Sequence, residues 1–172
     1  MKNFKMIIPA ALVILSACSQ STTGSKNASN STDSTATENP AAAQGLVATM
    51  QVADTIRVGS ALQMKFAVHN YADTATSFCK WHTPFERWMS KYLDIKDENG
   101  VEANYKGAMA KRVMPPPADS YIKLNAKDSV SVTVDLLEGY DISKPGKYTV
   151  RYQGGDISGL VVKDSLSFVY IK

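Results

Sequence analysis

Apolar and polar residues alternate with a period of two in four stretches of the chain beyond residue 60. In each stretch, every second residue is Leu, Val, Met, Phe or Tyr, and most residues between them are polar. A strand that places one face on a core and the other in water produces this period. The pattern predicts strands at 62–69, 130–136, 148–152 and 166–170.

Weaker patterns complete an all-β reading. Asn99-Gly100 favours a hairpin turn, because both residues tolerate the positive φ that a tight turn requires. Residues 84–89 are expected to form one or two helical turns, and Pro115–Pro117 an extended surface loop. The further strands are expected at 46–52, 77–81, 92–96, 101–105 and 121–124. About eight short strands without a long helix predict an immunoglobulin-like antiparallel β-sandwich over residues 46–172.

The segment before the strand at 148–152 adds a local signal. Pro145-Gly146 forms a predicted turn, and Tyr148 follows it at the start of the strand. This arrangement resembles the tyrosine corner of immunoglobulin-like domains, in which the phenol bonds to an upstream backbone carbonyl. A plain core tyrosine after a turn is the alternative.

The N-terminus has the pattern of an export signal. Lys2 and Lys5 precede an uncharged run from 6 to 15, which is about half as long as the roughly twenty residues of a membrane span. Leu15-Ser16-Ala17-Cys18 resembles the lipobox of bacterial lipoproteins. The resemblance implies a signal peptide at 1–17 and a diacylglycerol anchor with palmitate-type chains on Cys18. Export to the cell envelope, at the outer membrane, is then expected. An ordinary cleaved signal is the alternative.

Residues 18–45 are expected to form a flexible tether. After Cys18 they are mainly Ser, Thr, Asn, Ala and Gly, which bury too little apolar surface to offset the entropy of ordering. About 26 residues of such chain reach roughly 30 Å. The tether would lift the folded domain clear of a bilayer.

Charge and cysteine content exclude several classes of protein. Without Lys2 and Lys5, the 19 basic residues fall to 17 against 16 acidic ones. No Lys/Arg cluster with interleaved aromatics occurs, so a nucleic-acid partner is not expected. With Cys18 acylated, Cys79 is the one free thiol, and we interpret it as a small buried hydrophobe, with a reactive or metal-binding thiol as the alternative. The two histidines, His69 and His82, form no zinc signature, so no metal or cofactor is predicted.

Aromatic residues are concentrated between Phe78 and Trp88. If 77–81 is a strand, Trp81 and Cys79 face the core, as the strand-C tryptophan of an immunoglobulin domain would. Phe85 and Trp88 share a face of a helical turn, where they cap the core or meet a partner. The candidate partner-binding residues are Trp81, His82, Phe85, Trp88, Lys111 and Arg112.

Several motifs resemble a known family. They are Trp81-His82-Thr83-Pro84-Phe85-Glu86, then Tyr105-Lys106-Gly107, Glu138-Gly139-Tyr140-Asp141 and Pro145-Gly146-Lys147-Tyr148-Thr149-Val150. They are similar to the region that precedes the catalytic domain in peptidyl-Lys, deuterolysin-type zinc metallopeptidases. The family carries its zinc ligands in a His-Glu-x-x-His motif, which is absent here, so the resemblance implies the accessory β-domain without catalytic residues. His82 stands where the family has Asn.

Three classes of function follow. The leading one is a non-enzymatic, membrane-anchored module that binds an unidentified protein, such as a peptidase that it inhibits or chaperones. The second is a structural or glycan-binding envelope lipoprotein. For this class, Asp-Ser/Thr-apolar sequences suggest O-glycosylation at Ser34, Thr55, Thr74, Ser129 and Ser165, with the alternative that these pairs simply begin strands and turns. The third is a hydrolase with an unrecognised site built from Glu86, Lys111 and Cys79.

Overall fold

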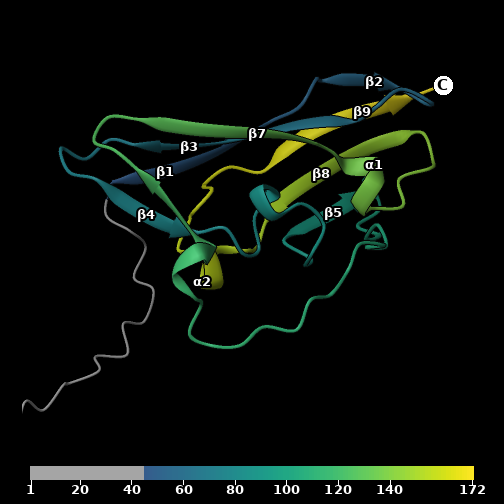
Figure 1. Ribbon diagram of the computed structural model, residues 1–172. Helices are drawn as coiled ribbons and strands as arrows, with labels where there is room; N and C mark the ends of the chain where they lie inside the picture. The colour runs from purple at the N-terminus through teal and green to yellow at the C-terminus, as the bar shows by residue number, and fades with distance from the viewer. Residues whose placement is uncertain (1–44) are drawn as a thin grey trace, which may run out of the picture. The chain divides into compact units, whose positions relative to one another are not determined.

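A computed structural model describes residues 45–172 (Figure 1). The expected signal peptide, Cys18, Ser34 and all of the tether before residue 45 lie outside the described residues. The strands are β1 Leu46–Gln51, β2 Thr55–Arg57, β3 Gln63–Asn70, β4 Thr76–Cys79, β5 Leu93–Asp97, β6 Tyr121–Leu124, β7 Ser129–Asp135, β8 Gly146–Tyr152 and β9 Leu166–Ile171. The short helices are η1 Pro84–Glu86, η2 Ala118–Ser120, α1 Leu136–Gly139 and α2 Gly155–Ser158.

Two sheets form an immunoglobulin-like sandwich, which confirms the predicted fold class. One sheet has the order β1-β3-β7 and the other β2-β9-β8-β5, with β4 and β6 pairing separately. Four alternating apolar residues, one just before β3 and three within it, are fully buried between the layers: Leu62, Met64, Phe66 and Val68. Their polar neighbours face outward, as the period of two requires.

One strand pair departs from the all-antiparallel expectation. β2 runs parallel to β9, with Ile56 opposite Tyr170. The chain changes sheets between β1, which pairs with β3, and β2. β2 has three residues, too few for an alternating pattern, so the sequence did not predict it.

Two other segments are shorter than expected. The stretch 101–105 forms two isolated bridges in place of a strand, Lys96 to Glu102 and Tyr105 to Tyr140. Ala103 N–H also donates to Ile95 O at 2.8 Å along the edge of β5. The expected helix at 84–89 is the single turn η1. Thr83 Oγ1 accepts Phe85 N–H at its start, and Arg87 ends it with a φ of +56°, a left-handed conformation that no helix continues.

The tyrosine corner is confirmed. Tyr148 donates its phenolic hydrogen to Lys144 O at 2.8 Å. The bond joins β8 to the turn before it, through which the chain passes from the β1-β3-β7 sheet to the other sheet. The contact therefore fixes the point where β8 enters its sheet, between β5 and β9.

The strand-C prediction for Trp81 is wrong. β4 ends at Cys79, Trp81 lies in the following turn, and β5 is the strand that pairs with β8. Trp81 is still 6% exposed, because the Arg112 side chain lies over its ring. The tryptophan of the main core is Trp88, which packs with Tyr92 and Tyr140.

Candidate protein-binding site

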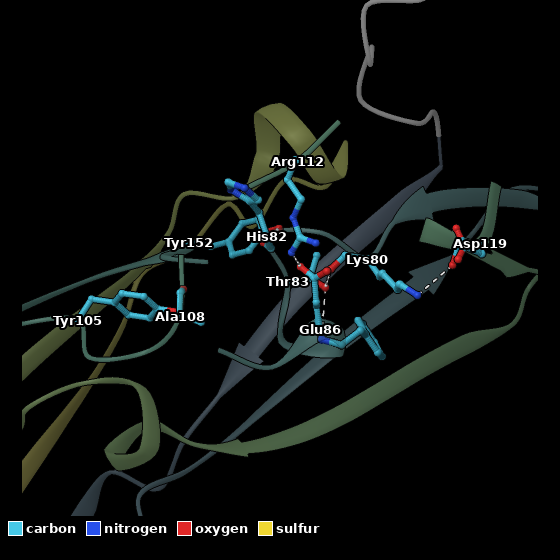
Figure 2. A network of polar contacts seen from close by, with 10 residues as sticks. Lys80, His82, Thr83, Glu86, Tyr105, Ala108, Arg112, Asp119 and Tyr152 are labelled. Carbon is cyan, nitrogen blue, oxygen red and sulfur yellow. Dashed lines mark hydrogen bonds and ion pairs between the residues drawn. The ribbon is translucent and has the colours of Figure 1, made fainter. Parts of the chain in front are cut away.

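The turn between β4 and η1 is held by hydrogen bonds from two directions (Figure 2). His82 has a φ of +58°, in the left-handed region that Asn also tolerates. Tyr152 on β8 donates its hydroxyl hydrogen to His82 O at 2.9 Å. On the other side, Thr83 Oγ1 donates to Lys80 O at 2.5 Å.

Arg112 joins this turn to a distant loop. Its guanidinium forms an ion pair with Glu86, with Nη2 and Oε2 2.5 Å apart, and lies 4.7 Å from the centre of the Trp81 ring. The side chains of Arg112 and Glu86 are 21% and 12% exposed. The buried Nε and Nη2 of Arg112 make no aligned hydrogen bond within the described residues. Charge attraction and stacking on Trp81 therefore hold the guanidinium in place.

Two titratable groups of this region are shifted toward their neutral forms. Burial, and then the nearby charge of Arg112, lowers the pKa of His82. Burial raises the pKa of the Cys79 thiol, with a further contribution from the carboxylate of Glu86. His82 is thus uncharged at neutral pH and Cys79 is a thiol rather than a thiolate, the less nucleophilic form.

The loop that carries Arg112, residues 106–117, is braced along its first half. Lys106 N–H donates to Gly139 O at 2.9 Å, Ala108 N–H to Trp88 O at 2.8 Å and Ala110 N–H to Met89 O at 3.0 Å. Tyr105 adds a hydroxyl bond to Ala108 O at 2.9 Å. The 106–117 loop therefore has a defined path over the end of the sandwich that contains Trp88.

Beyond these bonds, the 106–117 loop presents apolar side chains to solvent. Met109 is 72% exposed, Val113 82% and Met114 61%. Lys106 and Lys111 are exposed beside them, and no carboxylate occurs between Glu102 and Asp119. Exposed apolar side chains with cations around them are typical of a surface that another molecule covers.

The structure brings only some of the candidate site residues together. Trp81, His82 and Arg112 meet at the η1 turn, and Lys111 is exposed in the 106–117 loop. Phe85 packs against Phe66 and Phe78 in the second core cluster. Trp81 and Trp88 are 6% and 9% exposed, so their rings support the surface from below.

Sequence reasoning singled out Lys111 and Arg112 in this loop, but not Met109, Val113 or Met114. A signal for them exists in the chain. The run before Pro115–Pro117 combines large apolar residues with three cations and no acid. Prolines prevent the strand pairing that would bury those residues.

The remaining candidates are placed as follows. Of the proposed O-glycosylation residues, Thr55, Thr74, Ser129 and Ser165 are all exposed. Of the hydrolase candidates, Cys79 is 2% exposed and the Glu86 carboxylate is paired with Arg112.

Residues 45–172 contain neither a metal-binding cluster nor a membrane-spanning helix. No group of three or more His, Cys, Asp or Glu side chains is arranged to hold a metal ion there. In the same range, no helix has the length and apolarity needed to cross a membrane.

Comparisons with known proteins link the chain to proteases at low identity. No protein-family model matches. A neutral protease 2 homologue of Arthroderma gypseum is 26% identical over 92 residues, which cover 53% of this chain and 24% of the relative. An extracellular protease of Aeromonas hydrophila is 29% identical over 91 residues, covering 53% of this chain and 25% of the relative.

Among solved structures, a CARDB domain from Pyrococcus furiosus matches with a TM-score of 0.39 at 12% identity, covering 73% of this chain and 92% of that domain. A β-glucosidase from Listeria innocua matches with a TM-score of 0.38 at 12% identity, covering 74% of this chain and 16% of the enzyme. Over about half of its length the chain is therefore similar to protease homologues, and it spans about a quarter of theirs.

Proposed function

We propose that this chain is a non-catalytic protein-binding domain that docks on the catalytic domain of a peptidase. The observation that carries the proposal is the 106–117 loop, a braced segment with Met109, Val113 and Met114 exposed at its surface. The sequence similarity to protease homologues supports a peptidase as the partner. A domain of this kind would inhibit or chaperone the enzyme that it covers.

The composition of the 106–117 loop indicates the chemistry of the partner surface. Burial of three large apolar side chains supplies the main attraction, at about 25 cal/mol per Å² of apolar surface. Lys106 and Lys111 at the margin favour a rim of carboxylates, which steers association and sets orientation. The surface of the peptidase that the 106–117 loop contacts is thus expected to be an apolar depression with an acidic rim, next to the substrate cleft.

Binding to a named peptidase tests the proposal. The Aeromonas hydrophila extracellular protease is the probe, and its affinity for the immobilised protein is measured by biolayer interferometry. The double variant Met109→Asp/Val113→Asp is expected to weaken binding by about tenfold or more, because two exposed apolar contacts become charges that repel the acidic rim. Val58→Asp is the matched control, since Val58 is 45% exposed and follows β2. Absence of binding by the unaltered protein, or equal loss in the control, contradicts the proposal.

We further propose that Cys18 anchors the domain in the cell envelope through a lipid, with residues 19–44 as the spacer. The support is the sequence Leu15-Ser16-Ala17-Cys18 after an apolar run. Replacing Cys18 with Ser removes the thiol that accepts the diacylglycerol. The variant is expected to leave the membrane fraction on sedimentation, with Cys79→Ser as the control that stays. An unchanged membrane fraction in Cys18→Ser contradicts lipid anchoring.

A further inference from the structure

We propose that β7 is a dimerisation edge, where two copies of the chain pair their β7 strands antiparallel about a two-fold axis at Val132. The two β1-β3-β7 sheets then form one continuous sheet. β7 is the terminal strand in its sheet, with β3 as its one strand partner among the described residues (Figure 1).

The pairing register shows which backbone groups of β7 are free. At one end of the β3–β7 ladder, Asn70 N–H donates to Asp128 O, and at the other end Leu136 N–H donates to Leu62 O. Between these ends the register is continuous. Bonded and non-bonded pairs alternate in an antiparallel ladder, so the even-numbered residues of β7 bond to β3 and the odd-numbered ones face away. Within residues 45–172, the backbone groups of Ser131 and Thr133 accordingly have no hydrogen-bond partner.

These free groups are arranged symmetrically. Ser131 and Thr133 lie one residue to either side of Val132. In an antiparallel pair centred on Val132, Ser131 of one copy lies opposite Thr133 of the other. Each such pair exchanges two backbone hydrogen bonds, so the dimer gains four. The free groups of one copy are therefore complementary to those of a second copy.

The side chains of these residues suit the same pairing. Ser–Thr hydroxyl pairs across strands stabilise antiparallel sheets. The domain already contains one, because Thr149 and Ser167 are directly opposite on β8 and β9, with their oxygens 3.3 Å apart. The proposed interface would repeat this contact twice.

One edge of the other sheet, β5, carries protection that β7 lacks. β5 holds Asp94, Lys96 and Asp97, and backbone bonds to 101–103 cover part of its edge. From Ser129 to Val134, β7 has no charged residue, proline or glycine, the residues that usually keep edge strands from pairing. Its core-facing Val130 and Val132 are only half-buried, whereas Phe66 and Val68 on β3 are fully buried. A second sheet beyond β7 would cover the exposed part of these valines.

The experiment measures the dimer dissociation constant by sedimentation equilibrium across a concentration series. The sample is the chain from residue 18 with Cys18→Ser, which carries no lipid that would associate by itself. One strand from each copy makes a small interface, so a weak, concentration-dependent dimer is expected. The variant Ser131→Lys/Thr133→Lys places lysine opposite lysine twice, and the dissociation constant is expected to rise at least about tenfold.

A charge-swapped variant separates pairing from loss of folding. Ser131→Lys/Thr133→Glu places lysine opposite glutamate twice in the same register, and dimerisation is expected to return to at least the unaltered level. Circular dichroism checks that both variants keep their strands. The proposal is overturned if the unaltered protein stays monomeric at the highest concentration, or if the two variants dimerise equally.

Discussion

Replacing Trp88 with alanine is expected to lower the free energy of unfolding by about 3–5 kcal/mol. The indole stacks on Tyr92 with ring centres 5.4 Å apart, and meets Tyr140 edge to face at 5.6 Å. Gly139 lies directly against the ring, where any larger residue would collide with it. Removal of the indole therefore leaves a cavity among side chains that are themselves fully buried, Tyr92 and Tyr140.

Urea denaturation followed by tyrosine fluorescence measures this loss, because Trp88→Ala itself changes the tryptophan signal. Met89→Ala is the matched control. Met89 is the next residue, is 41% exposed, and is expected to change the free energy by less than about 0.5 kcal/mol. Equal stability of the two variants would contradict the assignment of Trp88 to the core.

Because Trp88 supports the fold, Trp88→Ala is not a suitable variant for testing binding by the domain. The backbone carbonyl of Trp88 accepts the N–H of Ala108. A backbone shift at residue 88, caused by loss of the indole, would therefore also displace the 106–117 loop. Reduced binding by Trp88→Ala would then report stability rather than contact. Met109 and Val113 are the informative positions, because their side chains are mostly exposed.

The alternation of apolar residues predicted most of the sandwich because a strand with one buried face has no other stable pattern. β3, β7, β8 and β9 were predicted in this way. β2 was not, since its three residues contain one buried side chain, Ile56. Its partner β9 lies at the other end of the chain, and the pairing depends on where β1 leaves its sheet.

The position of Trp81 shows a limit of the same reasoning. The prediction extended β4 to Trp81, because aromatic residues favour strands. The left-handed conformation of His82 and the contact with Arg112 place the indole elsewhere. Arg112 is separated by 26 residues from Glu86, and no local pattern links an ion pair over that distance. The cluster of Trp81, Glu86 and Arg112 is therefore a product of tertiary structure.

Replacing Gly154 with alanine is expected to destabilise the domain by about 2–3 kcal/mol through overpacking. A Cβ on Gly154 would collide with the backbone oxygen of His82 and would lie 2.6 Å from the hydroxyl of Tyr152. The His82 oxygen cannot rotate away as a side chain can. It is also the acceptor for the Tyr152 hydroxyl, so the methyl group would break the bond that ties the η1 turn to β8.

The consequence reaches the candidate binding surface. Displacement of His82 moves η1, which carries Glu86, and so weakens the ion pair that holds Arg112 and the second half of the 106–117 loop. Gly154→Ala is therefore expected to lower the thermal midpoint and to increase amide hydrogen exchange in residues 111–117. Gly100→Ala is the matched control, because Gly100 has a φ of +80° but open space around its Cβ position. That variant is expected to lose about 1 kcal/mol from backbone strain, with unchanged exchange in the loop. Equal exchange in both variants would show that the η1 turn does not hold the 106–117 loop.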